Sequence, residues 1–122
     1  MSILFKPYHI DAIREGTKTA TRRVWAENYN RPKPGRVYMA TTELFVSDEA
    51  CDCYIRVLDV HQEPLGEVDA ADARMEGGYQ DVDEFREAWE EINGADSWDP
   101  EQVVDVVTFE YVGRERPVEV GV

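Results

Sequence analysis

The sequence predicts one small α+β domain in which a mixed, mainly antiparallel sheet closes into a barrel with about three short helices packed outside. Three observations support this prediction. The chain has 122 residues, enough for one hydrophobic core but not for two. Hydrophobic residues make up 43% of it, as expected of a folded globular protein. The hydrophobic period changes between two and about 3.6 residues along the chain, which is typical of strands combined with helices.

The first third of the chain is predicted to contain a strand, a helix and a second strand. Residues 3–5 are an apolar run that suits a buried strand. The next segment opens with a proline, which the first turn of a helix tolerates, and Gly16 can end this helix. Residues 17–25 are rich in Thr and favour an extended backbone. Because side chains alternate along a strand, Lys18 and Thr21 can meet only if the strand starts about two residues before Thr21.

Three more strands are predicted beyond a loop rich in Asn, Pro and Gly. Apolar and polar side chains alternate well enough in residues 36–42 and 53–61 to predict two strands. Residues 43–52 between them are predicted to be a turn-bearing connection that continues either strand. Residues 103–112, VVDVVTFEYV, form the strongest strand pattern of the chain.

Two helices are predicted before the last strand, and each begins at an aspartate. Asp69 can cap a short helix that has Met75 facing inward and that ends at a glycine pair. Asp81 can cap the second helix, in which Phe85 and Trp89 share one apolar face.

This order contains no internal repeat and no second core. We therefore expect a single domain over residues 1–113 and a C-terminal tail over residues 114–122. No stretch approaches the ~18 apolar residues of a membrane span, and the first residues lack a secretory signal pattern. These features predict a cytoplasmic protein that has no membrane partner.

The charge of the chain is extreme and unevenly distributed. The formal net charge is −13, and only three of the 13 basic residues are Lys, a composition typical of a high-salt cytoplasm. Residues 1–36 carry eight basic and three acidic side chains, whereas residues 37–122 carry five basic and 23 acidic ones. A broad face that binds DNA is therefore not expected, but a local basic site in the first third is possible.

Cys51 and Cys53 are separated by one residue, a spacing that rarely forms a good disulfide. The two histidines of the chain complete no recognised zinc spacing. Ordinary reduced thiols are predicted, with no metal and no other cofactor.

Residues 15–23, EGTKTATRR, gather cations and hydroxyl groups in an otherwise acidic chain. Lys18 can take a proton from Thr21 if burial or a second cation lowers the pKa of the lysine, and Arg22 and Arg23 are close enough to supply that cation. The alternative is a polar strand, in which Thr is present for its β-propensity and the cations are solvated.

Glu76 is the candidate partner of this stretch. It falls in the last turn of the short helix, where the helix dipole raises the pKa of a carboxyl group. A partly buried Glu76 facing Lys18 is suited to proton transfer. The alternative is that Glu76 lies at a helix end by chance, because some of the 26 acidic residues of the chain are expected at such positions.

Taken together, these features resemble the ASCH domain family, whose fold is a PUA-like β-barrel. The resemblance extends over nearly the whole chain, and the Glu-Gly after the short helix is matched by Glu76. The most specific element is Gly-x-Lys-x-x-Thr-x-Arg, which is matched by Gly16, Lys18, Thr21 and Arg23.

The resemblance implies a function related to RNA or nucleosides. Small members of the family include amidohydrolases that act on N4-acetylcytidine, and others are linked to RNA binding or RNA cleavage. In an amidohydrolase, Thr21 would attack the acyl carbonyl, Lys18 would take its proton, and Glu76 would orient Lys18 or protonate the leaving amine. The alternatives are a non-catalytic RNA- or nucleotide-binding module and, third, a ribonuclease. The expected partner is a modified nucleoside or RNA; the oligomeric state stays open.

Four further residues are predicted to bind substrate. Gly16 would permit the turn that places Lys18, and Arg23 would orient the ligand together with Arg22. Trp25 could stack on a base, although aromatic residues near strands are more often part of the core.

Overall fold

The computed structural model describes residues 2–43 and 52–115, which form one five-stranded sheet and three α-helices in the predicted order. A short 3-10 turn, Leu65–Glu67, precedes the second helix. The helices are α1 (Pro7–Glu15), α2 (Ala70–Met75) and α3 (Val82–Asn93). The strands are β1 (Ser2–Leu4), β2 (Ala20–Arg23), β3 (Val37–Thr41), β4 (Cys53–Pro64) and β5 (Val103–Gly113).

The sheet has the strand order β1-β3-β4-β5-β2, in which only the β1–β3 pair is parallel. The prediction of a mixed, mainly antiparallel α+β fold with three helices is therefore confirmed. The closed barrel is not confirmed, because the described strands leave β1 and β2 as two open edges. Both edges are short, and a side chain joins them: Arg23 Nη2 donates a hydrogen bond to the Leu4 carbonyl at 2.5 Å.

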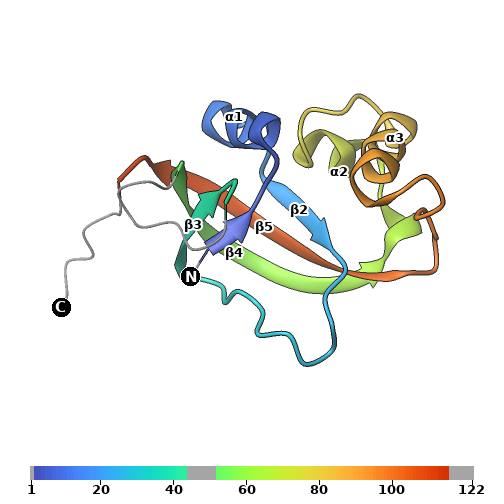
Figure 1. Cartoon of the computed structure of the whole chain (residues 1–122), viewed down its shortest axis with the longest axis horizontal. Helices are drawn as coiled ribbons and strands as arrows, with labels where there is room; N and C mark the ends of the chain where they lie inside the picture. The colour runs from blue at the N-terminus through green and yellow to red at the C-terminus, as the bar shows by residue number, and fades with distance from the viewer. Residues whose placement is uncertain (1, 44–51, 116–122) are drawn as a thin grey trace.

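The helices cover the sheet in two groups. Figure 1 shows α1 above one end of the sheet and α2 with α3 above the other, while β2 runs between them. Each group has its own core cluster. Ile10 and Ile13 of α1 pack on β1, β3, β4 and β5. Phe85 and Trp89 of α3 pack with Ala73 of α2 on the first half of β5 and on Leu65, which directly follows β4.

Helix α1 has the predicted ends, and α3 begins at the predicted residue. Pro7 occupies the first turn of α1, and Gly16 ends the helix with φ of 82°, a left-handed conformation that suits glycine. The Asp81 carboxylate accepts a hydrogen bond from the Glu84 N–H at 2.8 Å and so caps α3.

Helix α2 differs from the prediction in the residue that it buries. Asp69 and Asp72 form a reciprocal capping box, as the sequence indicates. Met75, however, is 36% exposed, so the prediction that it faces inward is wrong. The helix has only six residues, and its buried residue is Ala73.

Parts of two predicted segments lie outside the described residues. These parts are residues 44–51 of the connection, with Cys51, and residues 116–122 of the tail. Cys53 is buried on β4. Within residues 2–43 and 52–115, no group of three or more His, Cys, Asp and Glu side chains could hold a metal ion. No helix in the described part of the chain has both the length and the apolar character needed to cross a membrane.

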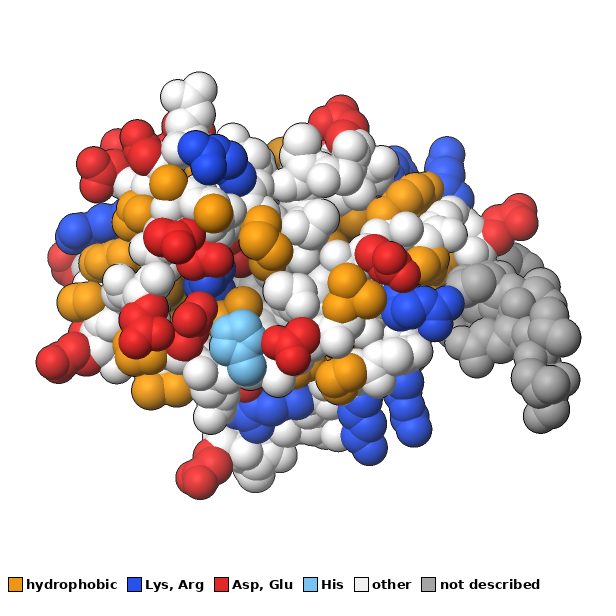
Figure 2. Space-filling model, turned by 180° about the vertical axis from the view of Figure 1, so that it is seen from behind, with side chains coloured by type: hydrophobic (Ala, Val, Ile, Leu, Met, Phe, Trp, Pro, Cys, Tyr) orange, Lys and Arg blue, Asp and Glu red, His pale blue; other side chains and the backbone are white. Residues whose placement is uncertain are grey.

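Acidic side chains dominate the exterior. Figure 2 shows Asp and Glu side chains spread over one side of the molecule, as the net charge of −13 requires. A site for an anionic ligand therefore needs positive charge gathered locally within an acidic molecule.

Candidate functional site

A cavity of about 520 Å³ lies where the two core clusters meet, and it takes residues from both. Its apolar side includes Phe5, Pro7, Phe85, Trp89 and Ile92. Its polar lining includes His9, Lys18, Thr21, Arg22, Arg23, Glu76 and Tyr79.

The charge inside the cavity is opposite to that of the exterior. Two of the charged residues that line it are acidic, Glu43 and Glu76. Four are basic: Lys6, Lys18, Arg22 and Arg23. The cavity is therefore a basic site in an acidic molecule, built from the first third of the chain as its charge distribution indicates.

Lys18 is held in place by the turn after α1 and by the end of α2. Gly16 turns the chain so that the Lys18 N–H donates to the Ala12 carbonyl at 3.1 Å. The backbone of Lys18 then forms an antiparallel bridge with Glu76. The Lys18 side chain is 3% exposed, and its Nζ donates to the carbonyls of Ala20 at 2.9 Å and Glu76 at 2.6 Å.

This environment changes the acidity of the lysine. Burial lowers the pKa of Lys18 to about 8, an effect that the charge of Glu76 opposes and the charges of Arg23 and Arg22 reinforce. A lysine with this pKa is neutral in roughly one molecule in ten at pH 7, far more than an ordinary lysine. Lys18 can therefore act as a base near neutral pH.

The carboxylate of Glu76 is bound more closely to Arg22 than to Lys18. Glu76 is 4% exposed and directly follows α2. Its Oε1 accepts from the Arg22 N–H at 3.2 Å and its Oε2 accepts from Arg22 Nη1 at 3.2 Å, whereas Lys18 Nζ lies 4.0 Å from Oε1. Burial raises the pKa of Glu76, and the charges of Lys18 and Arg22 oppose that rise.

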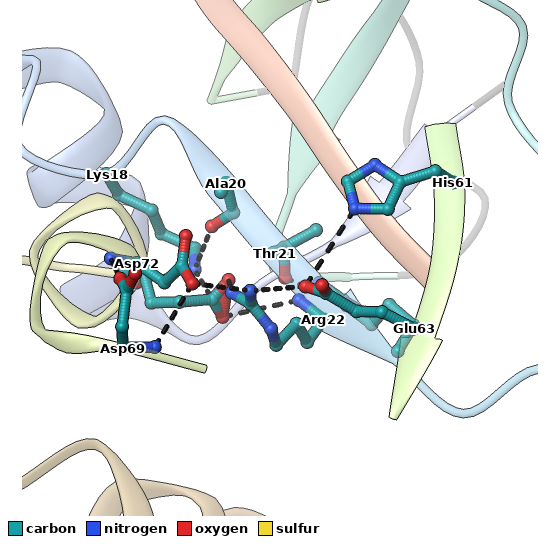
Figure 3. A network of polar contacts seen from close by, with 10 residues as sticks. Lys18, Ala20, Thr21, Arg22, His61, Glu63, Asp69 and Asp72 are labelled. Carbon is teal, nitrogen blue, oxygen red and sulfur yellow. Dashed lines mark hydrogen bonds and ion pairs between the residues drawn. The ribbon is translucent and has the colours of Figure 1, made fainter. Parts of the chain in front are cut away.

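Arg22 joins several carboxylates. Figure 3 shows this network, which runs from Lys18 to Arg22 and on to Glu63 and His61. Arg22 Nη2 lies 2.8 Å from Glu63 Oε1 and 3.5 Å from Asp72 Oδ2, in addition to the contacts with Glu76. Its guanidinium is therefore engaged by protein carboxylates and anchors Glu76, while substrate binding by Arg22 stays a prediction.

Thr21 is paired with Arg23. Thr21 is 4% exposed, and its Oγ1 accepts a hydrogen bond from Arg23 Nε at 3.1 Å. The Arg23 guanidinium also lies over the Phe5 ring, 5.0 Å from the centroid. Lys18 and Thr21 line the same cavity, but no hydrogen bond joins Lys18 Nζ to Thr21 Oγ1 in the described structure.

The other two predicted binding residues do not line the cavity. Gly16 acts through the turn that places Lys18. Trp25 is half-buried against the core cluster under α1, and its ring stacks on Tyr29 with centroids 4.7 Å apart. The structure therefore brings Lys18, Thr21, Arg22, Arg23 and Glu76 together, but not Trp25.

His9 and Tyr79 are cavity residues that the sequence does not reveal. His9 Nε2 and Tyr79 Oη are 2.9 Å apart and share a hydrogen bond. Seventy positions separate the two residues, and neither belongs to a recognisable motif. The only hint in the sequence is that Tyr79 follows the glycine pair after Glu76.

Comparison with solved structures finds the same fold in bacterial proteins. The crystal structure of an ASCH domain from Lactobacillus crispatus matches with a TM-score of 0.72 and 17% identity, over 93% of this chain and 78% of that one. The crystal structure of a DUF984 protein from Enterococcus faecalis matches with a TM-score of 0.58 and 21% identity, over 85% and 69%. No family model and no curated protein matches the sequence. The chain has the fold of the ASCH domain, as the sequence resemblance predicts.

Proposed function

We propose that this protein is an RNA- or nucleoside-related ASCH domain protein that removes the acyl group from N4-acetylcytidine-type nucleosides. The observation that carries the proposal is Lys18, a buried lysine whose pKa is lowered to about 8 beside a cavity that also contains Thr21 and Glu76. A base, a hydroxyl nucleophile and a carboxylate are the groups that amide hydrolysis needs.

The reaction divides into two steps. Neutral Lys18 takes the proton of the Thr21 hydroxyl, and Oγ1 attacks the acyl carbonyl. The carbon–nitrogen bond then breaks, and the Lys18 ammonium returns the proton to the leaving cytidine amine. Water hydrolyses the Thr21 ester in the second step and releases the carboxylic acid and free Thr21.

The proton needs a path from Thr21 to Lys18. Because the two side chains are not hydrogen-bonded to each other, the transfer requires one bridging water or a rotation of Thr21 about χ1. Arg23 supports the step from the other side. Its fixed cation at 3.1 Å from Oγ1 stabilises negative charge that develops on the oxygen.

The cavity suits a nucleoside in size and in character. Small-molecule sites have volumes of roughly 300–1,000 Å³, and this cavity has about 520 Å³. Phe85 and Trp89 offer apolar surface to a base, while other lining residues supply hydrogen-bonding groups. A free nucleoside carries no phosphate, so the acidic exterior does not repel it.

The test is release of cytidine from N4-acetylcytidine by the purified protein. We expect turnover that is reduced at least 100-fold in Lys18→Ala and Thr21→Ala, on the order of the loss seen when a nucleophile or its base is removed. Lys33→Ala is the matched control, because Lys33 is exposed and does not line the cavity. No turnover by the wild-type protein, at any salt concentration, would reject the amidohydrolase.

A non-catalytic module that binds RNA or nucleotides is the second candidate. Four basic and two acidic residues line the cavity, a balance that favours a ligand with negative charge. Binding of a short RNA without cleavage, together with no turnover of N4-acetylcytidine, would support this module. Cleavage of the RNA would instead support a ribonuclease.

A further inference from the structure

We propose that His9 and Tyr79 form a specificity pair that hydrogen-bonds the polar edge of a planar heterocyclic ring. The ring would be the pyrimidine base of the proposed substrate, so the inference rests on the proposed function. The pair takes no part in the proton transfers described above. Its role would be to bind the base of the substrate, whereas Lys18, Thr21 and Arg23 serve the reaction.

The local backbone is shaped to accommodate the pair. Gly77 directly follows Glu76 and has φ of 156°. A Cβ atom at this position would come within 3.1 Å of the Tyr79 ring and within 3.5 Å of the His9 ring. The two rings therefore pack directly over the backbone of residue 77, and their place in the cavity is tied to that of Glu76.

The pair has one donor and one acceptor to offer a ligand. A neutral imidazole has one N–H and one acceptor nitrogen, and a phenol hydroxyl can donate once and accept. If Tyr79 donates to His9 Nε2, the Nδ1–H and the phenol oxygen remain; if His9 donates, the hydroxyl hydrogen and Nδ1 remain. Among the described residues, these side chains hydrogen-bond only to each other. A donor next to an acceptor complements the C=O and N–H or N3 edge of a base.

Both members of the pair are neutral over the physiological range. Burial, reinforced by the charges of Lys18 and Arg23, lowers the pKa of His9 to about 3. Burial raises the pKa of Tyr79 to about 12. A cavity that already contains four cations therefore keeps one neutral polar feature, which suits an uncharged base edge better than a phosphate.

The apolar surroundings place a ring beside the pair. Tyr79 contacts Phe85 edge to face with centroids 5.9 Å apart, and Phe85 lies beside Trp89 at 6.3 Å. All three residues line the cavity. A planar ring that packs on Phe85 and Trp89 can direct its polar edge to the His9–Tyr79 pair.

The experiment measures the dissociation constants of cytidine and uridine, which exchange donor and acceptor at the 4-position. In Tyr79→Phe, which keeps the ring packing, we expect cytidine binding to weaken about 5- to 10-fold and the ratio of the two constants to approach one. His9→Gln keeps a neutral donor and acceptor, so it should weaken cytidine binding less than His9→Leu does. Tyr38→Phe is the control, because its hydroxyl accepts from Lys33 N–H outside the cavity and its loss should leave the ratio unchanged.

The outcomes separate the two proposals. A change in melting temperature with an unchanged cytidine-to-uridine ratio in both Tyr79→Phe and His9→Leu shows a structural role only and overturns the inference. Nucleoside binding that depends on the pair, without hydrolysis of N4-acetylcytidine, supports the inference while the amidohydrolase fails. If the wild-type protein binds neither nucleoside, the inference is overturned, whereas the amidohydrolase is still decided by turnover of N4-acetylcytidine.

Discussion

Arg23 donates a hydrogen bond from Nε to Thr21 Oγ1 at 3.1 Å, while Nη2 of the same guanidinium binds the Leu4 carbonyl at 2.5 Å. The second bond fixes the guanidinium on the opposite edge of the sheet. Thr21 thus faces a cation that cannot easily move away, and such a cation favours a threonine alkoxide over the neutral hydroxyl. The contact places the Arg23 cation beside Thr21, while substrate binding by Arg23 stays a prediction of the sequence motif.

Replacement of Arg23 should affect both activity and stability. In Arg23→Gln the cation next to Thr21 is lost, and we expect kcat to fall on the order of 100-fold. Loss of the bond to Leu4 should also lower the free energy of unfolding by about 1–3 kcal/mol. Arg23→Lys keeps the charge and should recover part of kcat. Arg36→Gln, at an exposed arginine, is the control. Full activity in Arg23→Gln would leave Arg23 as a structural link only.

The pH dependence of the proposed reaction follows from Lys18. The lysine must be neutral to accept a proton, and its pKa is about 8. We therefore expect kcat/KM to rise about tenfold per pH unit below pH 7 and to level off above pH 8. The pKa of His9, about 3, is too low to contribute in this range. A profile that is flat from pH 6 to pH 9 would exclude Lys18 as the base.

The same pKa shift acts on stability with a defined sign. The folded protein holds Lys18 with a pKa of about 8, below the ordinary lysine value of 10.5. Between these two pH values the unfolded chain binds more protons than the folded one, so the contribution of Lys18 to stability increases as the pH rises. Urea unfolding at pH 8 and pH 10, compared between the wild type and Lys18→Met, measures this contribution. In the variant, the part of the pH dependence that Lys18 causes should disappear.

Most of the fold can be predicted because its signals are local. The proline and glycine that bound α1, the aspartates that cap α2 and α3, and the alternation in β5 are each visible within a few residues. The sequence wrongly predicts that Met75 faces inward, because α2 is too short for periodicity to show which face of the helix is buried. Barrel closure cannot be deduced from local patterns, since it depends on whether two short edge strands meet.

The site was predicted only in part because its contacts join distant segments. The resemblance to a known motif identified Lys18, Thr21 and Glu76, which the structure places around one cavity. The partners of Arg22, which come from β4 and α2, follow from the fold and not from spacing. Trp25 stands two residues after Arg23, but the loop carries it to the core and to Tyr29.

Glu76 should be important to the stability of the folded protein. Its carboxylate binds the buried Arg22, so Glu76→Leu leaves that cation with fewer partners. We expect the free energy of unfolding to fall by about 3 kcal/mol in urea. The free energy of unfolding should fall less in Glu76→Gln, because the amide oxygen can still accept a hydrogen bond from Arg22. At 1 M KCl, where surface charges are screened, Glu87→Gln on the exposed face of α3 should have no measurable effect on the free energy of unfolding. Equal stability of the Leu variant and the wild type would contradict the anchoring role.

The net charge of −13 predicts a stability that depends on salt. Carboxylates spread over the surface repel one another, and salt screens this repulsion with a Debye length that falls from about 30 Å at 0.01 M to about 3 Å at 1 M. We expect the melting temperature to rise steadily over this range of KCl concentration. Removal of two surface charges in Glu87→Gln/Glu101→Gln should raise the melting temperature at low salt and leave it unchanged at high salt. A melting temperature that is the same at 0.01 M and 1 M KCl would show that the repulsion is not significant and would reject the high-salt interpretation of the composition.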